Sequence, residues 1–140
     1  MSSYERDNIF AKILRREIPA IEIFDDHHCM AIMDVFPQSK GHALIIPKVA
    51  SRNILDADPV QLALVIPYVQ RLAIASKKAL KADGIKVAQF NESAAGQTVF
   101  HLHWHIIPVY EGVELTPHAG GMADAGELAA MAQLIRAEMD

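Results

Sequence analysis

Residues 101–108 read His101-Leu102-His103-Trp104-His105-Ile106-Ile107-Pro108, with a histidine at every second position of the first five. Successive side chains of a β-strand point to opposite faces, so this stretch predicts one face with three histidines and one with Leu102, Trp104 and Ile106. The apolar face is suited to packing on a core, which leaves three imidazoles to face a cleft. A lone histidine is most often a hydrogen-bonded structural residue, but three in strict alternation indicate a functional site.

Neutral imidazoles in a cleft can act as nucleophiles, acids and bases, because their reference pKa of about 6.5 leaves them mostly unprotonated at neutral pH. Metal binding is the alternative. The backbones of His101 and His105 would lie ~13 Å apart on a strand, so all three histidines cannot bind one ion. Two of them could bind an ion with help from elsewhere, for which His42 is a candidate. The sequence has neither a G-x-x-x-x-G-K-[ST] loop nor a G-x-S-x-G motif, which argues against P-loop and α/β-hydrolase chemistry.

The segments around this stretch predict an α+β domain with an antiparallel five-stranded sheet, one long helix, and short N-terminal and C-terminal helices. Asp7 is a candidate N-cap for the first helix, which ends before Pro19. The long helix begins after Asp58 and ends by Gly84, with a kink or a fresh start near residue 63 because of Pro67. A last amphipathic helix covers about residues 124–139. The expected strands are Ile21–Phe24, Met30–Met33, His42–Ile46, Lys86–Asn91 and Leu102–Val109.

The composition limits the class of protein. The chain has 140 residues, of which 51% are hydrophobic and 21% charged, and this favours one globular domain over residues 1–140. Its formal net charge of −4 argues against broad nucleic-acid binding, which needs a dense basic surface. Cys29 alone cannot form an internal disulfide, and we expect a buried structural thiol. No secretory h-region is visible and no stretch approaches the ~20 apolar residues of a membrane helix, so we expect a cytoplasmic protein without membrane or nucleic-acid partners.

A short motif, Gly96-Gln97-Thr98, precedes the histidines. Glycine allows close backbone approach, and glutamine and threonine add neutral hydrogen-bond donors, so the motif is suited to binding phosphate. Such residues are also common in turns, and only their position beside the histidines makes them candidates.

The histidine stretch resembles the H-φ-H-φ-H-φ-φ signature of the histidine-triad (HIT) superfamily. The resemblance covers about residues 8–109 and is closest to the Hint branch and its bacterial relatives. The other matching segments, in order, are Asn8-Ile9-Phe10-Ala11-Lys12-Ile13, Glu17-Ile18-Pro19-Ala20, Asp34, Pro37, Gly41-His42-Ala43-Leu44-Ile45-Ile46-Pro47-Lys48, Asn91-Glu92 and Gly96-Gln97.

The resemblance implies a HIT-like fold and a hydrolase or transferase that acts at the α-phosphate of a nucleotide. By that similarity, His103 attacks phosphorus and forms a nucleotidyl intermediate, and His105 binds phosphate oxygens or the leaving group. His101 supports the site, and His42 completes it. Asp34 matches the residue that binds the ribose hydroxyls, and Asn91, Gln97 and Thr98 match sugar and phosphate contacts. The resemblance also implies that the base is a purine. The apolar residues that would enclose it are Ile9, Phe10, Ile13, Ile32, Met33 and Val35.

The departures from the family pattern limit these expectations. Some relatives hold zinc with a C-x-x-C pair, whose positions here are Asn8 and Ala11, so we expect neither zinc by that route nor any cofactor. The tail, 110–140, matches poorly, and the remaining histidines His27, His28 and His118 receive no role. The preferred function is hydrolysis of an AMP phosphoramidate or an aminoacyl adenylate by a homodimer. The alternatives are cleavage of dinucleoside polyphosphates, a nucleotide-binding regulator or scaffold with weak catalysis, and a histidine metal-binding protein.

Overall fold

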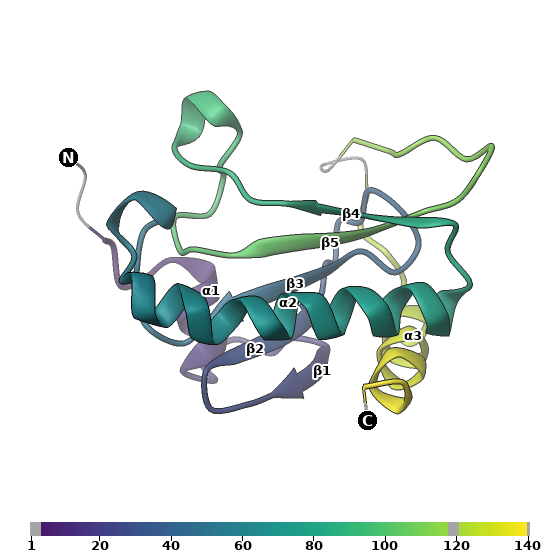
Figure 1. Ribbon diagram of the computed structural model, residues 1–140, viewed down its shortest axis with the longest axis horizontal. Coiled ribbons are helices and arrows are strands. Elements are labelled where there is room, and N and C mark those ends of the chain that lie inside the picture. The colour runs from purple at the N-terminus through teal and green to yellow at the C-terminus, as the bar shows by residue number, and fades with distance from the viewer. Residues whose placement is uncertain (1–3, 118–120, 140) are drawn as a thin grey trace.

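The fold is built on one five-stranded antiparallel sheet with the strand order β1-β2-β3-β5-β4 (Figure 1). The computed structural model describes residues 4–117 and 121–139. The strands are β1 (Glu22–Asp25), β2 (Cys29–Met33), β3 (Ala43–Pro47), β4 (Gly84–Ala88) and β5 (Trp104–Val109). The expected antiparallel α+β architecture is therefore confirmed.

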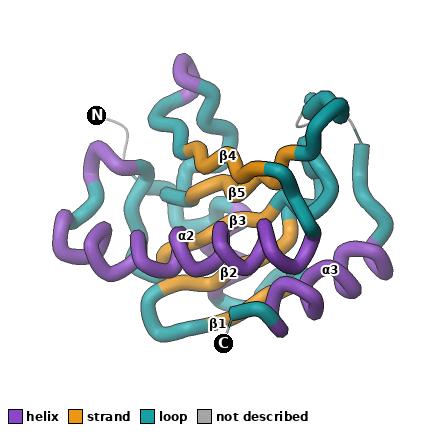
Figure 2. Tube along the Cα trace, turned by 45° about the vertical axis from the view of Figure 1, so that its right-hand side comes forward, coloured by secondary structure: helices purple, strands orange, loops and turns teal. Residues whose placement is uncertain are grey.

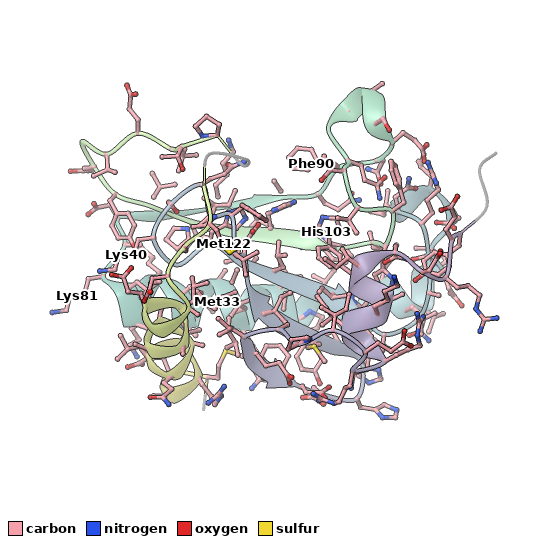
Figure 3. All side chains as sticks on the ribbon, turned by 180° about the vertical axis from the view of Figure 1, so that it is seen from behind. Met33, Lys40, Lys81, Phe90, His103 and Met122 are labelled. Carbon is pink, nitrogen blue, oxygen red and sulfur yellow. The ribbon has the colours of Figure 1, made fainter. Side chains whose placement is uncertain are left out.

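The helices cover the two faces of the sheet unequally. Helix α2 (Pro59–Leu80) crosses one face with α3 (Ala125–Ala137) beside it, as Figures 1 and 2 show. Helix α1 (Ile9–Leu14) lies on the other face, which is turned to the viewer in Figure 3. Two 3-10 turns, η1 (Ile54–Asp56) and η2 (Ser93–Ala95), lie in the loops.

Strand alternation divides the core between these faces. On the α2 side, Ala31, Ile45, Trp104 and Ile106 belong to the larger buried cluster. Leu102, just before β5, joins them, so the apolar half of the histidine stretch packs as predicted. On the α1 side lies a smaller cluster, formed by Phe10, Ile13, Met30, Ile32, Leu44 and Ile46. Burial of both faces fixes the strand register, because a slip of one residue would exchange the two sets of side chains.

Several helix boundaries differ from the sequence-based expectations. The N-cap of α1 is Asn8 rather than Asp7, because the Asn8 Oδ1 accepts a hydrogen bond from the Ala11 N–H at 2.9 Å. Asp58 does cap α2, but the helix runs without a fresh start through Pro67. It ends at Leu80, before Gly84, because Lys81 takes the left-handed conformation (φ 54°). Gly84 instead begins β4.

The connection between β4 and β5 is longer than the sequence suggested. Residues 89–103 leave the ladder, so β4 ends at Ala88 rather than Asn91 and β5 begins at Trp104 rather than Leu102. The Leu102 N–H bonds the Ser51 carbonyl at 2.9 Å, outside the sheet. His103 therefore precedes the strand, although the expected strand Leu102–Val109 included it, and His101 lies further outside.

Helix α2 has an unusually apolar surface for its position. It is long and apolar enough to cross a membrane by length and composition, contrary to the sequence-based expectation, and 28% of its most apolar window is buried. Large side chains stay exposed along it, including Val60, Ile66 and Ile74. Val87, on the edge strand β4, is exposed as well.

Candidate active site

A cavity of about 340 Å³ lies between α1, the ends of β2 and β3, and the segment that leads into β5. Its volume is in the range of small-molecule sites, and its walls are largely apolar. The predicted site residues that line it are Ile9, Phe10, Ile13, Ile32, Met33, Asp34, Val35, Thr98, His103 and His105. Met33 also belongs to the larger core on the other face of the sheet.

The hydrogen bonds of His103 determine which ring nitrogen can react. Its Nδ1 donates to the backbone carbonyl of His101 at 2.6 Å, so in the neutral ring Nε2 has the lone pair. Phe10 packs edge-on against this ring, with centroids 4.8 Å apart. A buried imidazole whose orientation is fixed by two contacts and whose Nε2 has the lone pair can act as a nucleophile.

His42 and His105 form a chain with the opposite polarity. The Gln38 N–H donates to Nδ1 of His42 at 3.0 Å, so the proton of the neutral His42 ring lies on Nε2. This Nε2 is 3.0 Å from Nδ1 of His105, which must therefore accept. Nε2 of His105 is then protonated. The cavity thus contains one imidazole with its lone pair on Nε2 and a neighbour, 5.0 Å away between centroids, with its proton on Nε2. Such a pair can supply a nucleophile and a proton donor.

His101 does not face the cavity, contrary to the expectation that all three imidazoles share it. Its Nε2 donates to the Pro47 carbonyl at 2.8 Å, and its Nδ1 accepts from the Tyr4 hydroxyl at 2.6 Å. Burial lowers the pKa of His101 to about 4, so the ring stays neutral. The chain turns here because β5 has not yet begun. His101 acts on His103 through its backbone carbonyl.

Asp34 is buried at the edge of the cavity, next to the histidine chain. Its Oδ1 accepts from the Phe36 N–H at 2.8 Å, and its Oδ2 lies 3.5 Å from Nε2 of His42. Ligand atoms of Asp34, His42 and His105 lie within 4.8 Å of one another, so these three residues could approach one metal ion. An ion on Nε2 of His42 would move the ring proton to Nδ1, where it would face the Gln38 N–H. The hydrogen bonds therefore favour a proton-donating chain over metal binding.

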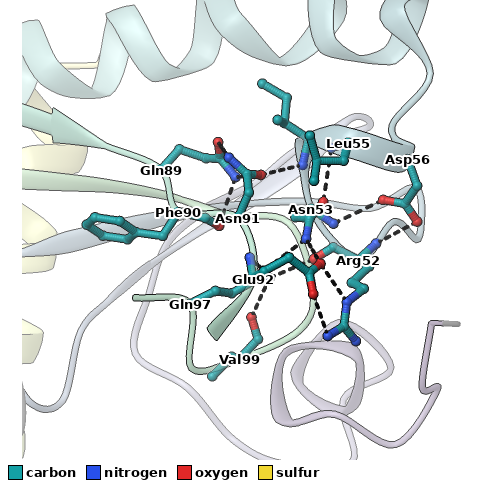
Figure 4. Close-up of polar contacts among 11 residues, drawn as sticks. Arg52, Asn53, Leu55, Asp56, Gln89, Phe90, Asn91, Glu92, Gln97 and Val99 are labelled. Carbon is teal, nitrogen blue, oxygen red and sulfur yellow. Dashed lines mark hydrogen bonds and ion pairs between the residues drawn. The ribbon is translucent and has the colours of Figure 1, made fainter. Parts of the chain in front are cut away.

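A polar network fastens the β4–β5 loop to the segment before α2 (Figure 4). The Arg52 guanidinium forms two hydrogen bonds to Glu92, at 2.9 and 3.1 Å, and lies over the Phe100 ring at 4.1 Å. This ion pair lowers the pKa of the Glu92 carboxyl. Asn53 also donates to Glu92, at 2.5 Å, and to Gln97 at 3.0 Å. The network holds Glu92 at φ 77° and fixes the loop that leads to His103.

Two predicted contact residues belong to this network rather than to the cavity wall. The Gln97 amide accepts from Asn53 and the Glu92 N–H, and donates to the carbonyls of Arg52 and Val99. All four of its hydrogen-bonding positions are thus used within the protein. Asn91 bonds Gln89 and the Ile54 N–H. Phosphate or sugar contact by either side chain stays a prediction, whereas Thr98 lines the cavity.

The sequence-based prediction missed part of the cavity wall and the groups that set the tautomers. Phe36, Leu44 and Val99 line the cavity. Leu44 could have been found, because it pairs with Ile32 in the ladder and shares its face. Gln38 contributes a backbone N–H, for which the sequence has no signal. His27 is exposed, His28 is half-buried, and His118 lies outside the described residues.

Comparisons with known proteins show the family and the fold of the chain. A family model described as "HIT domain" matches residues 15–112. The structure of a HIT-like protein involved in cell-cycle regulation from Bartonella henselae, with an unknown ligand, is 51% identical and superimposes with a TM-score of 0.94 over 98% of this chain and 99% of that one. A Zn-bound histidine triad family protein from Mycobacterium smegmatis is 33% identical, with a TM-score of 0.84 over 95% of this chain and 93% of that one. Adenylylsulfatase HINT3 from Arabidopsis thaliana is 37% identical over 76% of this chain, and the match spans 54% of that protein.

Proposed function

The chain belongs to the HIT domain family, whose members bind or hydrolyse nucleotides, and on that premise we propose that it hydrolyses an AMP derivative at the α-phosphate. The preferred substrates are an AMP phosphoramidate or an aminoacyl adenylate. The observation that supports this most is the pair of opposite tautomers at the cavity, an acceptor Nε2 on His103 beside a donor Nε2 on His105.

The first step transfers the nucleotidyl group to the protein. Nε2 of His103 attacks the α-phosphorus, a phosphorus–nitrogen bond forms, and the bond from phosphorus to the leaving group breaks. An amine leaving group takes the Nε2 proton of His105, so that it departs neutral. His103, bonded to phosphorus at Nε2 and still protonated at Nδ1, then carries one positive charge, which balances the negative charge left on the His105 ring. The chain from Gln38 through His42 keeps that proton on the correct nitrogen of His105 before the reaction.

The second step releases AMP. Water attacks the phosphorus from the side that the leaving group has vacated, and the phosphorus–nitrogen bond to His103 breaks. His105, deprotonated by the first step, accepts a proton from this water and regains its starting state. The atoms of one water are thereby divided between AMP and the leaving group, and no external reactant besides water is required.

The rest of the cavity suits the nucleoside. The apolar wall from α1 and β2 would enclose a base, with Ile9, Phe10 and Val35 among its residues. Asp34 lies at the border between this wall and the histidines, where its carboxylate would accept hydrogen bonds from both ribose hydroxyls. Preference for a purine and a cytoplasmic location remain predictions.

A substrate panel tests the proposed reaction. The name of the HINT3 relative states that it is an adenylylsulfatase, and adenylyl sulfate also places its leaving group on an α-phosphate. The panel therefore contains an AMP alkylamide, an aminoacyl adenylate, adenylyl sulfate and a dinucleoside polyphosphate. We expect the amide or the aminoacyl adenylate to have the highest kcat/KM. A higher value for the dinucleoside polyphosphate would contradict the proposal, as would turnover of none of the four.

The nucleophile has its own test. His103→Ala should abolish turnover and remove the acid-labile nucleotidyl adduct that rapid quench detects in the wild type. His105→Ala should keep a fraction of the activity, because the nucleophile remains while proton donation is lost. His27→Ala, at an exposed turn, is the matched control and should change neither. Turnover by His103→Ala within a few-fold of wild type would disprove the mechanism.

We also propose that two copies associate through the edge strand β4 and the apolar face of α2. An exposed edge strand can pair with a second chain, and the exposed apolar side chains of α2 would be buried in such a dimer. Ile74→Glu should convert the dimer into a monomer in sedimentation experiments, whereas Leu134→Glu, at a residue that is also exposed but lies on α3, should not. A wild-type protein that sediments as a monomer at micromolar concentration would contradict this.

A further inference from the structure

We propose that Thr116, in the tail beyond β5, is a positioning residue that acts through the backbone of residues 37 and 38 on the proton-donating chain of the active site. The expected effect on turnover rests on the proposed function, whereas the expected effect on the His42 tautomer does not depend on it. Thr116 lies outside the residues that line the cavity and after the segment that the family model matches. We therefore infer that it acts through the backbone and not through a contact with substrate.

The tail is fastened to the loop between β2 and β3. The Thr116 N–H donates to the Gln38 carbonyl at 2.7 Å, and its hydroxyl lies 3.0 Å from the Pro37 carbonyl and 3.2 Å from that of Gln38. Ala123, further along, donates its N–H to the Val35 carbonyl at 2.9 Å. Tyr110 donates its hydroxyl to the Lys40 carbonyl at 2.9 Å.

One peptide plane connects Thr116 to the histidines. The Pro37 carbonyl and the Gln38 N–H belong to the same planar peptide unit, and they point in opposite directions because the bond is trans. The Thr116 hydroxyl binds one end of this unit, and Nδ1 of His42 accepts from the other end at 3.0 Å. A rotation of the plane would weaken both bonds together. A hydrogen bond on the carbonyl also polarises the N–H and makes it a better donor.

The Gln38 N–H determines the tautomer of His42 and, through His42, the tautomer of His105. It holds Nδ1 of His42 unprotonated, which leaves the proton on Nε2, and Nε2 lies 3.0 Å from Nδ1 of His105. His105 consequently presents its proton on Nε2. If the peptide plane moves, the tautomer of His42 with its proton on Nδ1 becomes more populated. His105 then loses the hydrogen bond from Nε2 of His42 that determines its own tautomer.

The first experiment reads the tautomers directly, in the full-length protein without substrate. Long-range nitrogen–proton spectra of histidine-labelled protein report which ring nitrogen is protonated, with His42 assigned by the loss of its signals in His42→Gln. In Thr116→Val, which keeps the backbone N–H and removes the hydroxyl, we expect the Nδ1 signal of His42 to move toward the protonated position. Thr116→Ser keeps the hydroxyl and should restore the wild-type signal. Tyr110→Phe removes a hydroxyl from the same tail and should have no effect.

The second experiment compares leaving groups. An AMP alkylamide needs a proton from His105 for its amine to leave, whereas adenylyl sulfate releases sulfate, which needs none. Thr116→Val should lower kcat for the amide by about three- to tenfold, the range of one neutral hydrogen bond, and leave kcat for adenylyl sulfate within twofold. A merely structural role would lower both equally.

Each outcome decides the proposal. An altered His42 tautomer in Thr116→Val, restored by serine, supports it, and selective loss on the amide supports its kinetic part. An unchanged His42 signal overturns it, and so does an equal loss on both substrates. If the wild type hydrolyses neither compound, the proposed function fails, and the spectra alone then decide the role of Thr116.

Discussion

Replacement of Gly41 by any larger residue should lower the free energy of unfolding. Gly41 lies between the β2–β3 loop and His42, with φ 92°, in the left-handed region that disfavours side chains. A Cβ atom placed on it would lie 2.0 Å from the Cδ1 of Leu80 and 3.3 Å from the Cγ of Pro108. The change Gly41→Ala therefore combines backbone strain with a steric clash at the end of α2.

The cost can be worked out from these two contributions. The left-handed backbone disfavours alanine by about 1–2 kcal/mol, and a clash that a leucine side chain must relieve by moving adds about 1–3 kcal/mol. Alanine also restricts the unfolded chain, which returns about 0.5–1 kcal/mol. We expect the free energy of unfolding to fall by about 1–4.5 kcal/mol. At about 3 °C per kcal/mol for a chain of this size, Tm should fall by about 3–14 °C.

Urea and thermal unfolding of Gly41→Ala and Gly84→Ala test this reasoning. Gly84 is the matched control, because a Cβ there would meet nothing within 4 Å and its φ is not positive. Gly84→Ala should leave stability unchanged or raise it by up to about 1 kcal/mol, since alanine is preferred to glycine in a strand. If Gly41→Ala unfolds within about 0.5 kcal/mol of wild type, the strain and the clash are not what the geometry implies.

Three further predictions follow from buried polar groups. Asp34→Ala should weaken AMP binding by about tenfold or more in titration calorimetry, because a charge-assisted hydrogen bond contributes about 1.5–3 kcal/mol. Equal affinity of the wild type for AMP and 2′-deoxy-AMP would refute the ribose contact. His101, whose pKa burial lowers to about 4, is neutral in the folded state and protonates near pH 6.5 when unfolded. Stability should therefore fall by about 2–3 kcal/mol between pH 7.5 and pH 4.5, and urea unfolding of His101→Asn should show a correspondingly smaller fall. Cys29 is fully buried, and burial raises its pKa to about 12. A thiol reagent at pH 8 should therefore react with it only after unfolding in urea. Rapid labelling of the native protein would contradict its burial.

Local patterns in the sequence were sufficient for the architecture. The alternation of Leu102, Trp104 and Ile106 predicted the face that packs under α2, and the capping carboxylate Asp58 marked where the long helix begins. These predictions succeeded because the period of a strand and the cap of a helix depend on neighbours within a few residues. The two boundary errors are also local. Asn8, next to Asp7, is the N-cap of α1, and Lys81, three residues before Gly84, is the C-cap of α2.

The residues that meet in the cavity were largely predictable, but their protonation was not. The motif and the resemblance pointed to His103, His105 and Asp34, and all three line the cavity. The tautomers depend instead on backbone groups, namely the carbonyl of His101 and the N–H of Gln38. Almost every residue has a backbone carbonyl and N–H, so the residue types in the sequence do not indicate which of these backbone groups will face an imidazole.

The sequence by itself therefore determined the strand and helix periods, the division of the core and the family, because side-chain chemistry at short spacing decides each of these. Only tertiary packing decided that His101 turns from the cavity toward Tyr4 and Pro47. It also decided that Gln97 uses all four of its hydrogen-bonding positions to join the β4–β5 loop to the segment before α2. It also decided that Thr116 meets the peptide of residues 37 and 38 from 79 positions away. Contacts of this kind form only when distant segments pack, and their energies depend on the direction of individual hydrogen bonds, which no local pattern encodes.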